Sequence, residues 1–301
     1  MTDLFDEIVR VRKEGTPAAL ATIVATRGST PGREAMRLLV LEDGTFLGTV
    51  GGGCLEAEVY DTALEVLKDE QSQTLQFRLT EKDSPDSGLL CGGEVTVFVE
   101  PITTPTLWIY GGGHISKALC HVASLAGFQV TICDDRETYA NAERFPEAAE
   151  TLAEAYPDAV KRMPMRANSY AVVVTRGHKE DGVVLEALHE RHKQGERSKF
   201  LGMIGSKSKR LLLFKALREQ GCDEAFLEAI RSPVGLCIGA RSHEEIAVAV
   251  VAELIAVRRT GETAAAAWEA RKKSGAAETR EVLLDETGDR KVSPSGEPAA
   301  D

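Results

Sequence analysis

The chain lacks the excess of basic residues that sequence-independent nucleic-acid binding requires. Its 47 Asp and Glu outnumber its 36 Lys and Arg, and the formal net charge is −11 over 301 residues. A protein that binds nucleic acid independently of sequence uses a basic surface to displace the counterions of the phosphate backbone. We therefore expect no nucleic-acid partner.

Long apolar segments are missing as well. The longest apolar stretch, residues 246–257, is interrupted by Glu253 and is too short to span a bilayer. The first 15 residues are charged and amphipathic, without the apolar core of a signal peptide. We expect no membrane segment and a cytoplasmic location.

Closely spaced cysteines are also absent. The six cysteines form no C-x-x-C pair, so zinc-finger spacing is missing, and a disulfide framework is not expected in the cytosol. They are Cys54, Cys91, Cys120, Cys133, Cys222 and Cys237. Any cysteine with a function is expected to be a reduced thiol.

With 301 residues the chain is long enough for two domains of ordinary size, and 43% hydrophobic residues are enough to build a core in each. Residues 1–100 predict a small α+β domain, with helices at 3–13 and 55–68 and strands at 19–26, 37–41, 45–50, 74–79 and 94–100. Residues 107–258 alternate strand and helix, which predicts a Rossmann-like, doubly wound parallel sheet and an α/β protein overall. The boundary is expected at 101–106, which contains two prolines, and residues 260–301 are expected to be a helical fringe and a disordered tail.

Three glycines follow the first strand of the second domain. The apolar segment 107–110 runs into Gly111, Gly112 and Gly113, and helical periodicity begins at Ile115. Gly111 is expected to take a positive φ, and Gly113 to let a phosphate approach the helix N-terminus. The pattern predicts a phosphate or nucleotide site, although glycine turns of this kind also occur for structural reasons alone.

A carboxylate follows the glycine turn at the sequence spacing typical of dinucleotide-binding domains, in which such a residue binds the ribose. Asp134 ends the second strand, about 20 residues after Gly113, and is predicted to accept from ribose hydroxyls. The third glycine of the usual fingerprint is replaced by Ser116. His114 follows the glycines, where its ring could reach a phosphate or cap the loop.

Other polar residues follow later strands of this domain. His178 is expected at the carboxyl end of the sheet, where it could contact a ligand or transfer a proton. Ser206 is placed as a helix N-cap with Lys207 beside it, and Ser242 with Glu245 has the spacing of a capping box.

In the first domain, Cys54 follows Gly51, Gly52 and Gly53 at the expected start of a helix. A helix N-terminus stabilises a thiolate and offers backbone amides to an anion, so Cys54 could be reactive. Composition alone equally permits a small buried residue behind a glycine turn.

A second cysteine, Cys91, precedes Gly92 and Gly93 just before a strand. Two glycine-flanked thiols in one domain could share a soft metal or a sulfur-rich ligand. A structural zinc site is less suitable, because it needs four ligands. The turn 27–32 carries Arg, two hydroxyls and two glycines, which suit a phosphate or pterin edge or a plain hairpin turn.

Together these motifs resemble the XdhC/CoxI family, the accessory factors of xanthine dehydrogenase and related molybdenum hydroxylases. The resemblance covers residues 1–258 and rests on segments 28–32, 51–56, 91–94, 98–101, 111–114, 134–136, 202–206 and 232–236. Two positions depart from the family pattern. Cys237 stands where an aspartate is usual, and Arg176 where a histidine is common.

The resemblance implies a cytosolic factor, commonly a dimer, that binds molybdenum cofactor as molybdopterin or its dinucleotide form and hands it to an apo-molybdenum hydroxylase. A cysteine desulfurase is implied as a further partner, because the cofactor's terminal sulfur is installed while it is held. Cys54 and Cys91 would then contact molybdenum, while the Rossmann-like domain would hold the phosphate or dinucleotide end. Such a factor need not be a catalyst.

A rival interpretation is an NAD(P)-dependent oxidoreductase. The glycine turn and Asp134 favour it, but no motif identifies a substrate or a hydride-transfer site. A nucleotide-sensing regulatory module is a third possibility, since Rossmann-like domains host unrelated functions.

Overall fold

The computed structural model describes residues 3–78, 93–260, 279–284 and 290–292. Its two compact units are Met1–Thr103 with Arg271–Asp301, and Thr104–Ala270. The division between them falls inside the segment 101–106 that carries the two prolines. Both units mix helices and strands, as predicted.

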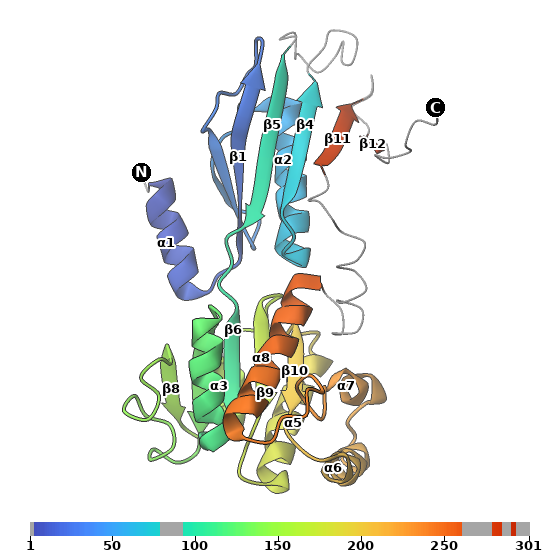
Figure 1. The fold of residues 1–301 in the computed structure, drawn as a ribbon. Helices are drawn as coiled ribbons and strands as arrows, with labels where there is room; N and C mark the ends of the chain where they lie inside the picture. The colour runs from blue at the N-terminus through green and yellow to red at the C-terminus, as the bar shows by residue number, and fades with distance from the viewer. Residues whose placement is uncertain (1–2, 79–92, 261–278, 285–289, 293–301) are drawn as a thin grey trace. The chain divides into compact units, whose positions relative to one another are not determined.

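The first unit is a mostly antiparallel sheet with a helix packed on one face (Figure 1). Among the described residues, seven strands have the order β12-β11-β4-β5-β1-β2-β3. Its elements are α1 (Leu4–Glu14), β1 (Ala18–Arg27), β2 (Arg37–Leu41), β3 (Phe46–Gly48), α2 (Gly53–Asp69), β4 (Gln73–Arg78), β5 (Glu94–Pro101), β11 (Thr279–Leu284) and β12 (Arg290–Val292).

Apolar periodicity explains how α2 and the sheet pack. On α2, residues Leu55, Val59, Ala63 and Val66 recur at helical spacing and are fully buried. On β5, every second residue from Val95 to Val99 is buried, so this face of the strand meets the helix.

The end of the chain differs from the expected tail. Residues 279–284 pair in parallel with β4, from Thr279 opposite Thr74 to Val282 opposite Phe77, and β12 pairs with β11. Low hydrophobicity favours disorder over 260–301, but a strand can add to an open sheet edge through backbone hydrogen bonds alone. The rest of 261–301 lies outside the described residues.

The second unit is a parallel sheet with the order β10-β9-β6-β7-β8 and with helices on both faces. Its elements are β6 (Thr106–Tyr110), α3 (His114–Leu125), β7 (Gln129–Asp134), β8 (Glu150–Ala153), α4 (Tyr156–Arg162), β9 (Ser169–Val173), α5 (His178–Lys193), β10 (Phe200–Met203), α6 (Lys207–Glu219), α7 (Glu224–Ala229) and α8 (His243–Thr260). This is the predicted doubly wound, Rossmann-like domain.

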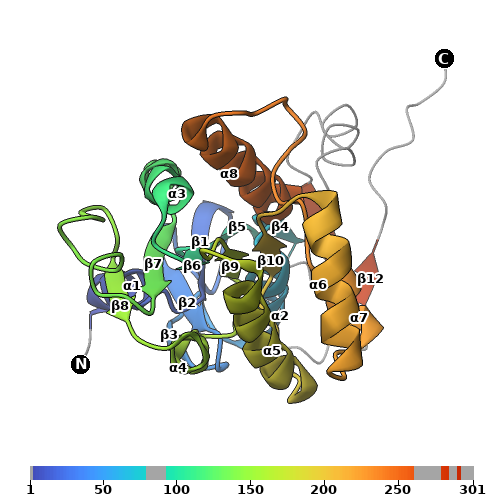
Figure 2. The ribbon, with the colours of Figure 1, turned by 90° about the horizontal axis from the view of Figure 1, so that it is seen from below.

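A hydrophobic core lies on each face of this parallel sheet. One contains side chains of α3 and α8 and the other side chains of α4 to α7. Figure 2 shows α3 and α8 on one side of the strands and α5 on the other. Because both faces are covered, every residue of β6 and β9 is buried, which explains their continuous apolar sequences.

The strand order indicates where a fold of this kind is expected to bind a ligand. The order reverses between β6 and β9, and doubly wound sheets bind ligands at the carboxyl ends of the strands beside such a reversal. The residues that follow β6 are the glycines 111–113. No helix in the described part of the chain is both long enough and apolar enough to cross a membrane.

Candidate functional site

The three glycines after β6 have different roles. Gly111 has φ +117°, and a Cβ there would lie 2.2 Å from the carbonyl oxygen of Val174. A Cβ on Gly112 would lie 2.1 Å from the carbonyl oxygen of Tyr139. Gly113 has φ −74°, and a Cβ there would meet no atom within 4 Å. The first two glycines are required by packing, and the third leaves open space at the N-terminus of α3.

Both polar groups of Gly112 are held by side chains. Its amide donates to Asp134 Oδ2 at 2.8 Å, and its carbonyl accepts from Arg144 Nε at 2.9 Å. Asp134 Oδ1 also accepts from the backbone amide and Nε of Arg136, at 3.1 and 2.8 Å. The Asp134 side chain is 1% exposed, so it faces the glycine turn.

Two opposing effects act on the Asp134 carboxyl. Burial alone would raise its pKa, but the hydrogen bonds from Arg136 and from the Gly112 amide outweigh burial and hold the pKa below its usual value. Asp134 is therefore an ionised carboxylate that fixes the glycine turn. The sequence pattern instead suggests a carboxylate that is free for a ribose hydroxyl.

Sequence reasoning missed an ion pair beside this turn. Arg176, in the loop after β9, binds both oxygens of Asp135, in the loop after β7, at 3.0 and 2.9 Å. The two residues are 41 positions apart and become neighbours only because β9, β6 and β7 are adjacent in the sheet.

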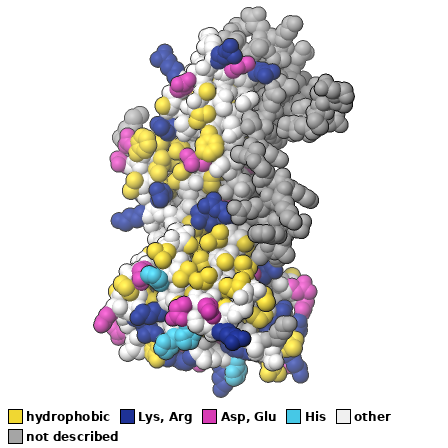
Figure 3. Space-filling view, viewed as in Figure 1, with side chains coloured by type: hydrophobic (Ala, Val, Ile, Leu, Met, Phe, Trp, Pro, Cys, Tyr) yellow, Lys and Arg dark blue, Asp and Glu magenta, His cyan; other side chains and the backbone are white. Residues whose placement is uncertain are grey.

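His114 lies on the outer side of the turn. Its ring is exposed and stacks on that of His243, at the start of α8, with centroids 5.5 Å apart and planes 18° apart. A cavity of about 390 Å³ lies along this face of α3, and Lys117, His121 and Arg144 also line it. Histidine, acidic and basic side chains gather at the lower end of this unit in Figure 3, the end at which β6 finishes in Figure 1. His114 therefore faces α8 and this cavity and does not cap the loop.

Side chains after β9 and β10 form a further cluster that the sequence did not predict. Asp181 is buried, accepts from Thr175 Oγ1 at 2.6 Å and pairs with Lys209 Nζ at 2.5 Å. Ser206 caps α6 by accepting from the Lys209 amide at 3.2 Å, as expected. His178 begins α5 and is exposed.

The expected capping box before α8 also forms. The Ser242 hydroxyl accepts from the Glu245 amide at 3.2 Å, and Glu245 accepts from the Ser242 amide at 3.0 Å.

In the first unit, the glycine turn before α2 is tightly organised. Gly51, Gly52 and Gly53 have φ of +120°, +79° and +64°. Glu56, in the first turn of α2, accepts from the Thr49 hydroxyl and from the Val50 amide. A Cβ on Gly52 or Gly53 would meet no atom within 4 Å, so this side of the turn is open. Cys54 lies directly after the open side and is half-buried.

Glycines also bring three separate segments together. A Cβ on Gly32 would lie 2.3 Å from the Val50 carbonyl oxygen, and one on Gly51 would lie 2.8 Å from the Gly32 amide nitrogen. A Cβ on Gly93 would lie 2.3 Å from the Ser29 carbonyl oxygen. The turn 27–32, the turn before Cys54 and the start of β5 therefore pack backbone to backbone. Cys91 and Gly92 lie outside the described residues.

The remaining described cysteines are of two kinds. Cys120, Cys133 and Cys222 are buried, and Cys237 is exposed. Burial raises the pKa of Cys120 to about 11 and also raises the pKa of Cys133 and of Cys222, so these three are neutral thiols. Within the part of the chain that the structure describes, no group of three or more His, Cys, Asp and Glu is placed to hold a metal ion.

Comparison with known proteins identifies the family. The model described as XdhC Rossmann domain matches residues 107–254, and the model described as XdhC and CoxI family matches residues 11–78. The chain belongs to the XdhC and CoxI family, as its motifs predicted.

Three relatives share much of the chain. YqeB of Escherichia coli (strain K12), an uncharacterized protein, is 32% identical over 85% of this chain and 46% of its own length, so the chain spans about half of YqeB. A probable xanthine dehydrogenase subunit of Bacillus subtilis (strain 168) is 25% identical over 80% of this chain and 93% of its own length. The molybdenum cofactor insertion chaperone PaoD of Escherichia coli (strain K12) is 24% identical over 86% of this chain and 90% of its own length.

Proposed function

We propose that this protein is an accessory factor for the maturation of a molybdenum hydroxylase of the xanthine dehydrogenase type. It binds molybdenum cofactor as cargo and delivers it to the apoenzyme. The family supports this role, and so do the names of two relatives, a molybdenum cofactor insertion chaperone and a probable xanthine dehydrogenase subunit.

The observation that carries the proposal is the open glycine turn beside Cys54. The backbone at Gly52 and Gly53 is left-handed and has no atom above it, so a flat ligand can approach the amides at the start of α2. A thiolate is a soft donor that suits a sulfur-bound metal. Cys54 is therefore proposed to contact the metal of the cargo, with Cys91 as a second thiol.

The second unit offers a separate anion site. Gly113 leaves open space over the first amides of α3, where the helix dipole favours a phosphate. Asp134 supports this site indirectly, because it holds the Gly112 amide and so fixes the turn. The phosphate or dinucleotide end of the cofactor is proposed to bind here.

Anaerobic titration of the full chain with cofactor released from a molybdenum enzyme tests the proposal. We expect saturable binding with about one site per chain, and molybdopterin or its dinucleotide form in the mass spectrum of ligand that survives anaerobic purification. Absence of saturable binding would remove the proposal.

One observation favours a second candidate function. The open glycine turn at the reversal between β6 and β9 also suits the pyrophosphate of NAD(P), as in an oxidoreductase. The same titration with NAD and NADP, followed by a search for turnover, separates the two candidates. Tight dinucleotide binding with turnover and no cofactor binding would select the oxidoreductase.

The partners and the setting follow from the proposed role. The factor acts in the cytoplasm, with an apo-molybdenum hydroxylase as client and a cysteine desulfurase as sulfur donor, and it works as a homodimer. Co-purification with each candidate and sedimentation of the isolated chain test these points independently of cofactor binding.

A further inference from the structure

The ion pair between Arg176 and Asp135 reaches across the end of β6. The two residues lie in the loops after β9 and β7, the strands on either side of β6. Neighbouring strands are about 4.8 Å apart, so the loops after β9 and β7 are separated by roughly 10 Å. A direct contact between these side chains therefore passes the carboxyl end of β6, where the glycine turn begins.

The loop that carries Arg176 also packs against the glycine turn. A Cβ on Gly111 would lie 2.9 Å from the Cα of Thr175, the residue before Arg176. Gly113, two residues further along the turn, leaves open space at the N-terminus of α3. The Arg176 side chain is 41% exposed, so its guanidinium is accessible to a ligand at this end of the sheet.

Arg176 has two carboxylate partners, and both pairs are open to water. Besides Asp135, Glu180 contributes Oε1 at 3.3 Å from Nε of Arg176, and the two acidic side chains are 33% and 28% exposed. Exposed ion pairs contribute little to stability, because solvent screens them. A phosphate binds a guanidinium through the same two parallel hydrogen bonds as a carboxylate and carries more negative charge. It can therefore replace Asp135 while Glu180 keeps the guanidinium near the turn.

A buried hydroxyl beside the ion pair also points to a ligand. Tyr156 begins α4, in the segment after β8, and is 3% exposed, and its hydroxyl has no hydrogen-bond partner among the described residues. Burial chiefly raises its pKa, Asp135 raises it further and Arg176 lowers it, so the hydroxyl lies close to the ion pair. Buried tyrosine hydroxyls usually have a partner. This end of the sheet thus has one donor more than its own acceptors use, which favours a ligand that brings acceptor oxygens, as a phosphate does.

We propose that Arg176 binds a phosphate group of the ligand at the glycine turn, and that Asp135 occupies the guanidinium until the phosphate replaces it. The proposal rests on the anion site proposed above for the second unit and adds the side chain that neutralises the phosphate there. Asp135 opposes the ligand in two ways, because it competes for Arg176 and because its own charge repels a phosphate. Neutralising Asp135 should therefore strengthen binding, and neutralising Arg176 should weaken it.

Isothermal titration of the full chain with inorganic pyrophosphate, at fixed pH and ionic strength, tests this inference. Arg176→Gln should bind about tenfold more weakly than the wild type, because it loses a charge-assisted hydrogen bond. Asp135→Asn should bind roughly two- to fivefold more tightly, which is the range of an exposed ion pair. In the Arg176→Gln background, Asp135→Asn should tighten binding less than in the wild type, because the competition for the guanidinium is gone.

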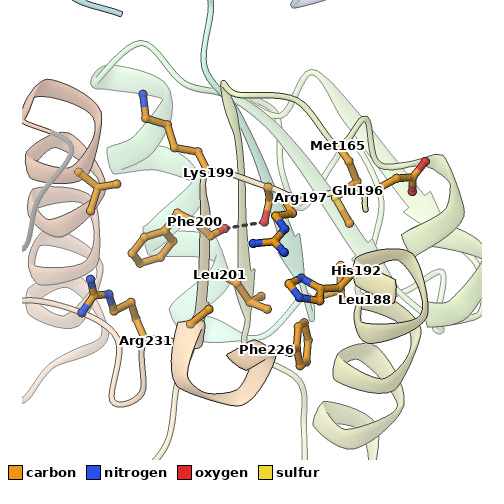
Figure 4. A pocket seen from close by; sticks show the side chains of 13 residues that line it. Met165, Leu188, His192, Glu196, Arg197, Lys199, Phe200, Leu201, Phe226 and Arg231 are labelled. Atoms are coloured by element: carbon orange, nitrogen blue, oxygen red, sulfur yellow. Dashed lines mark hydrogen bonds between the residues drawn. The ribbon is translucent and has the colours of Figure 1, made fainter. Parts of the chain in front are cut away.

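Glu196→Gln and Arg197→Gln are the matched controls, since each changes the net charge by the same amount as one test variant. Both residues line a cavity at the amino end of β10, the opposite end of the sheet from the glycine turn (Figure 4). The controls should leave the affinity for pyrophosphate unchanged. None of the four substituted side chains is buried, so all variants should fold, as circular dichroism would verify.

Three results would overturn the inference. They are the absence of saturable pyrophosphate binding in both the wild type and Asp135→Asn, wild-type affinity in Arg176→Gln, and tightening by Glu196→Gln as large as that by Asp135→Asn. Repeating the titrations with released molybdenum cofactor and with NAD identifies which ligand supplies the phosphate. Cofactor that binds the wild type and Arg176→Gln equally would overturn the inference while the proposed function stands. Pyrophosphate affinities in the expected order without any cofactor binding would remove the proposed function alone.

Discussion

Arg176 and Asp135 form a two-pronged ion pair, with Nη1–Oδ1 and Nη2–Oδ2 distances of 3.0 and 2.9 Å. The pair connects the loops that follow β9 and β7, the two neighbours of β6 in the sheet. It therefore links the loops on either side of the glycine turn. The preceding residue, Asp134, pairs with a different arginine, Arg136, and is buried. The two consecutive aspartates therefore both form ion pairs, one buried at Asp134 and one partly exposed at Asp135.

Asp134 and Asp135 should contribute differently to the free energy of unfolding. Asp134→Ala removes a buried carboxylate and leaves the Gly112 amide without its acceptor, so we expect a loss of roughly 1–3 kcal/mol of unfolding free energy. Asp135→Ala removes an exposed pair and should cost less than about 1 kcal/mol. Urea unfolding followed by circular dichroism measures both. Equal losses would show that Asp134 does not hold the turn.

The same carboxylate predicts how stability depends on pH. The pKa of Asp134 is lowered in the folded protein from an ordinary value of 3.8. Its contribution is therefore complete above that ordinary value and is lost as the pH falls through the lowered one. Unfolding free energies measured from about pH 6 to about pH 3 should fall less steeply in Asp134→Asn than in the wild type. Parallel curves would assign the acid dependence to other groups.

Two substitutions in the glycine turn should separate folding from ligand binding. Gly111→Ala places a Cβ 2.2 Å from a backbone oxygen at a positive φ, and should destabilise the fold by roughly 3 kcal/mol or more. Gly113→Val enters open space at a φ of −74°, so the protein should fold but lose ligand at the α3 N-terminus. Thermal melting and binding of mononucleotide and dinucleotide cofactor forms and of NAD measure the two effects. Normal binding by a folded Gly113→Val protein would make the turn purely structural.

The cysteines should divide according to exposure and pKa. Iodoacetamide should label Cys54 and Cys237 well before Cys120, Cys133 and Cys222, whose burial raises the thiol pKa. Peptide mass spectrometry after timed labelling measures this order, and early labelling of the buried group would contradict the packing.

Cofactor retention should follow a related division. Cys54→Ser and Cys91→Ser should weaken retention of molybdenum cofactor, whereas Cys120→Ser and Cys222→Ser should leave it intact. Anaerobic gel filtration of loaded protein, with molybdenum measured in each fraction, makes the comparison. Equal retention in all four variants would assign Cys54 and Cys91 a structural role.

The sequence predicted the parts of the fold whose signals are local. The glycine-ended strand 107–110, the helix after it and the capping box at Ser242 all formed as expected. Short elements were missed: β8 and α7, of four and six residues, are too brief for a periodic pattern to appear.

The candidate site shows a different limit. The spacing between Gly113 and Asp134 correctly placed a carboxylate at the end of the second strand. It could not show that this carboxylate faces inward, because its partner Arg136, and Arg144, which binds the Gly112 carbonyl, lie in a loop without a repeating pattern. Arg176 and Asp135, and the three segments that meet at Gly32, Gly51 and Gly93, are likewise distant in sequence. Only the strand order brings such residues together.

The pairing of β11 with β4 has a consequence for how the chain is made. β5 ends at Pro101 and β11 begins at Thr279, so about 180 residues separate two strands of one sheet. A ribosome that adds about 5–20 residues per second needs roughly 10 to 35 seconds to synthesise them. Throughout that interval the nascent first unit carries β4 as an open edge, while the whole second unit emerges and folds. The second unit is therefore synthesised before the sheet of the first unit is complete, and the β4 edge stays unprotected until β11 has been translated.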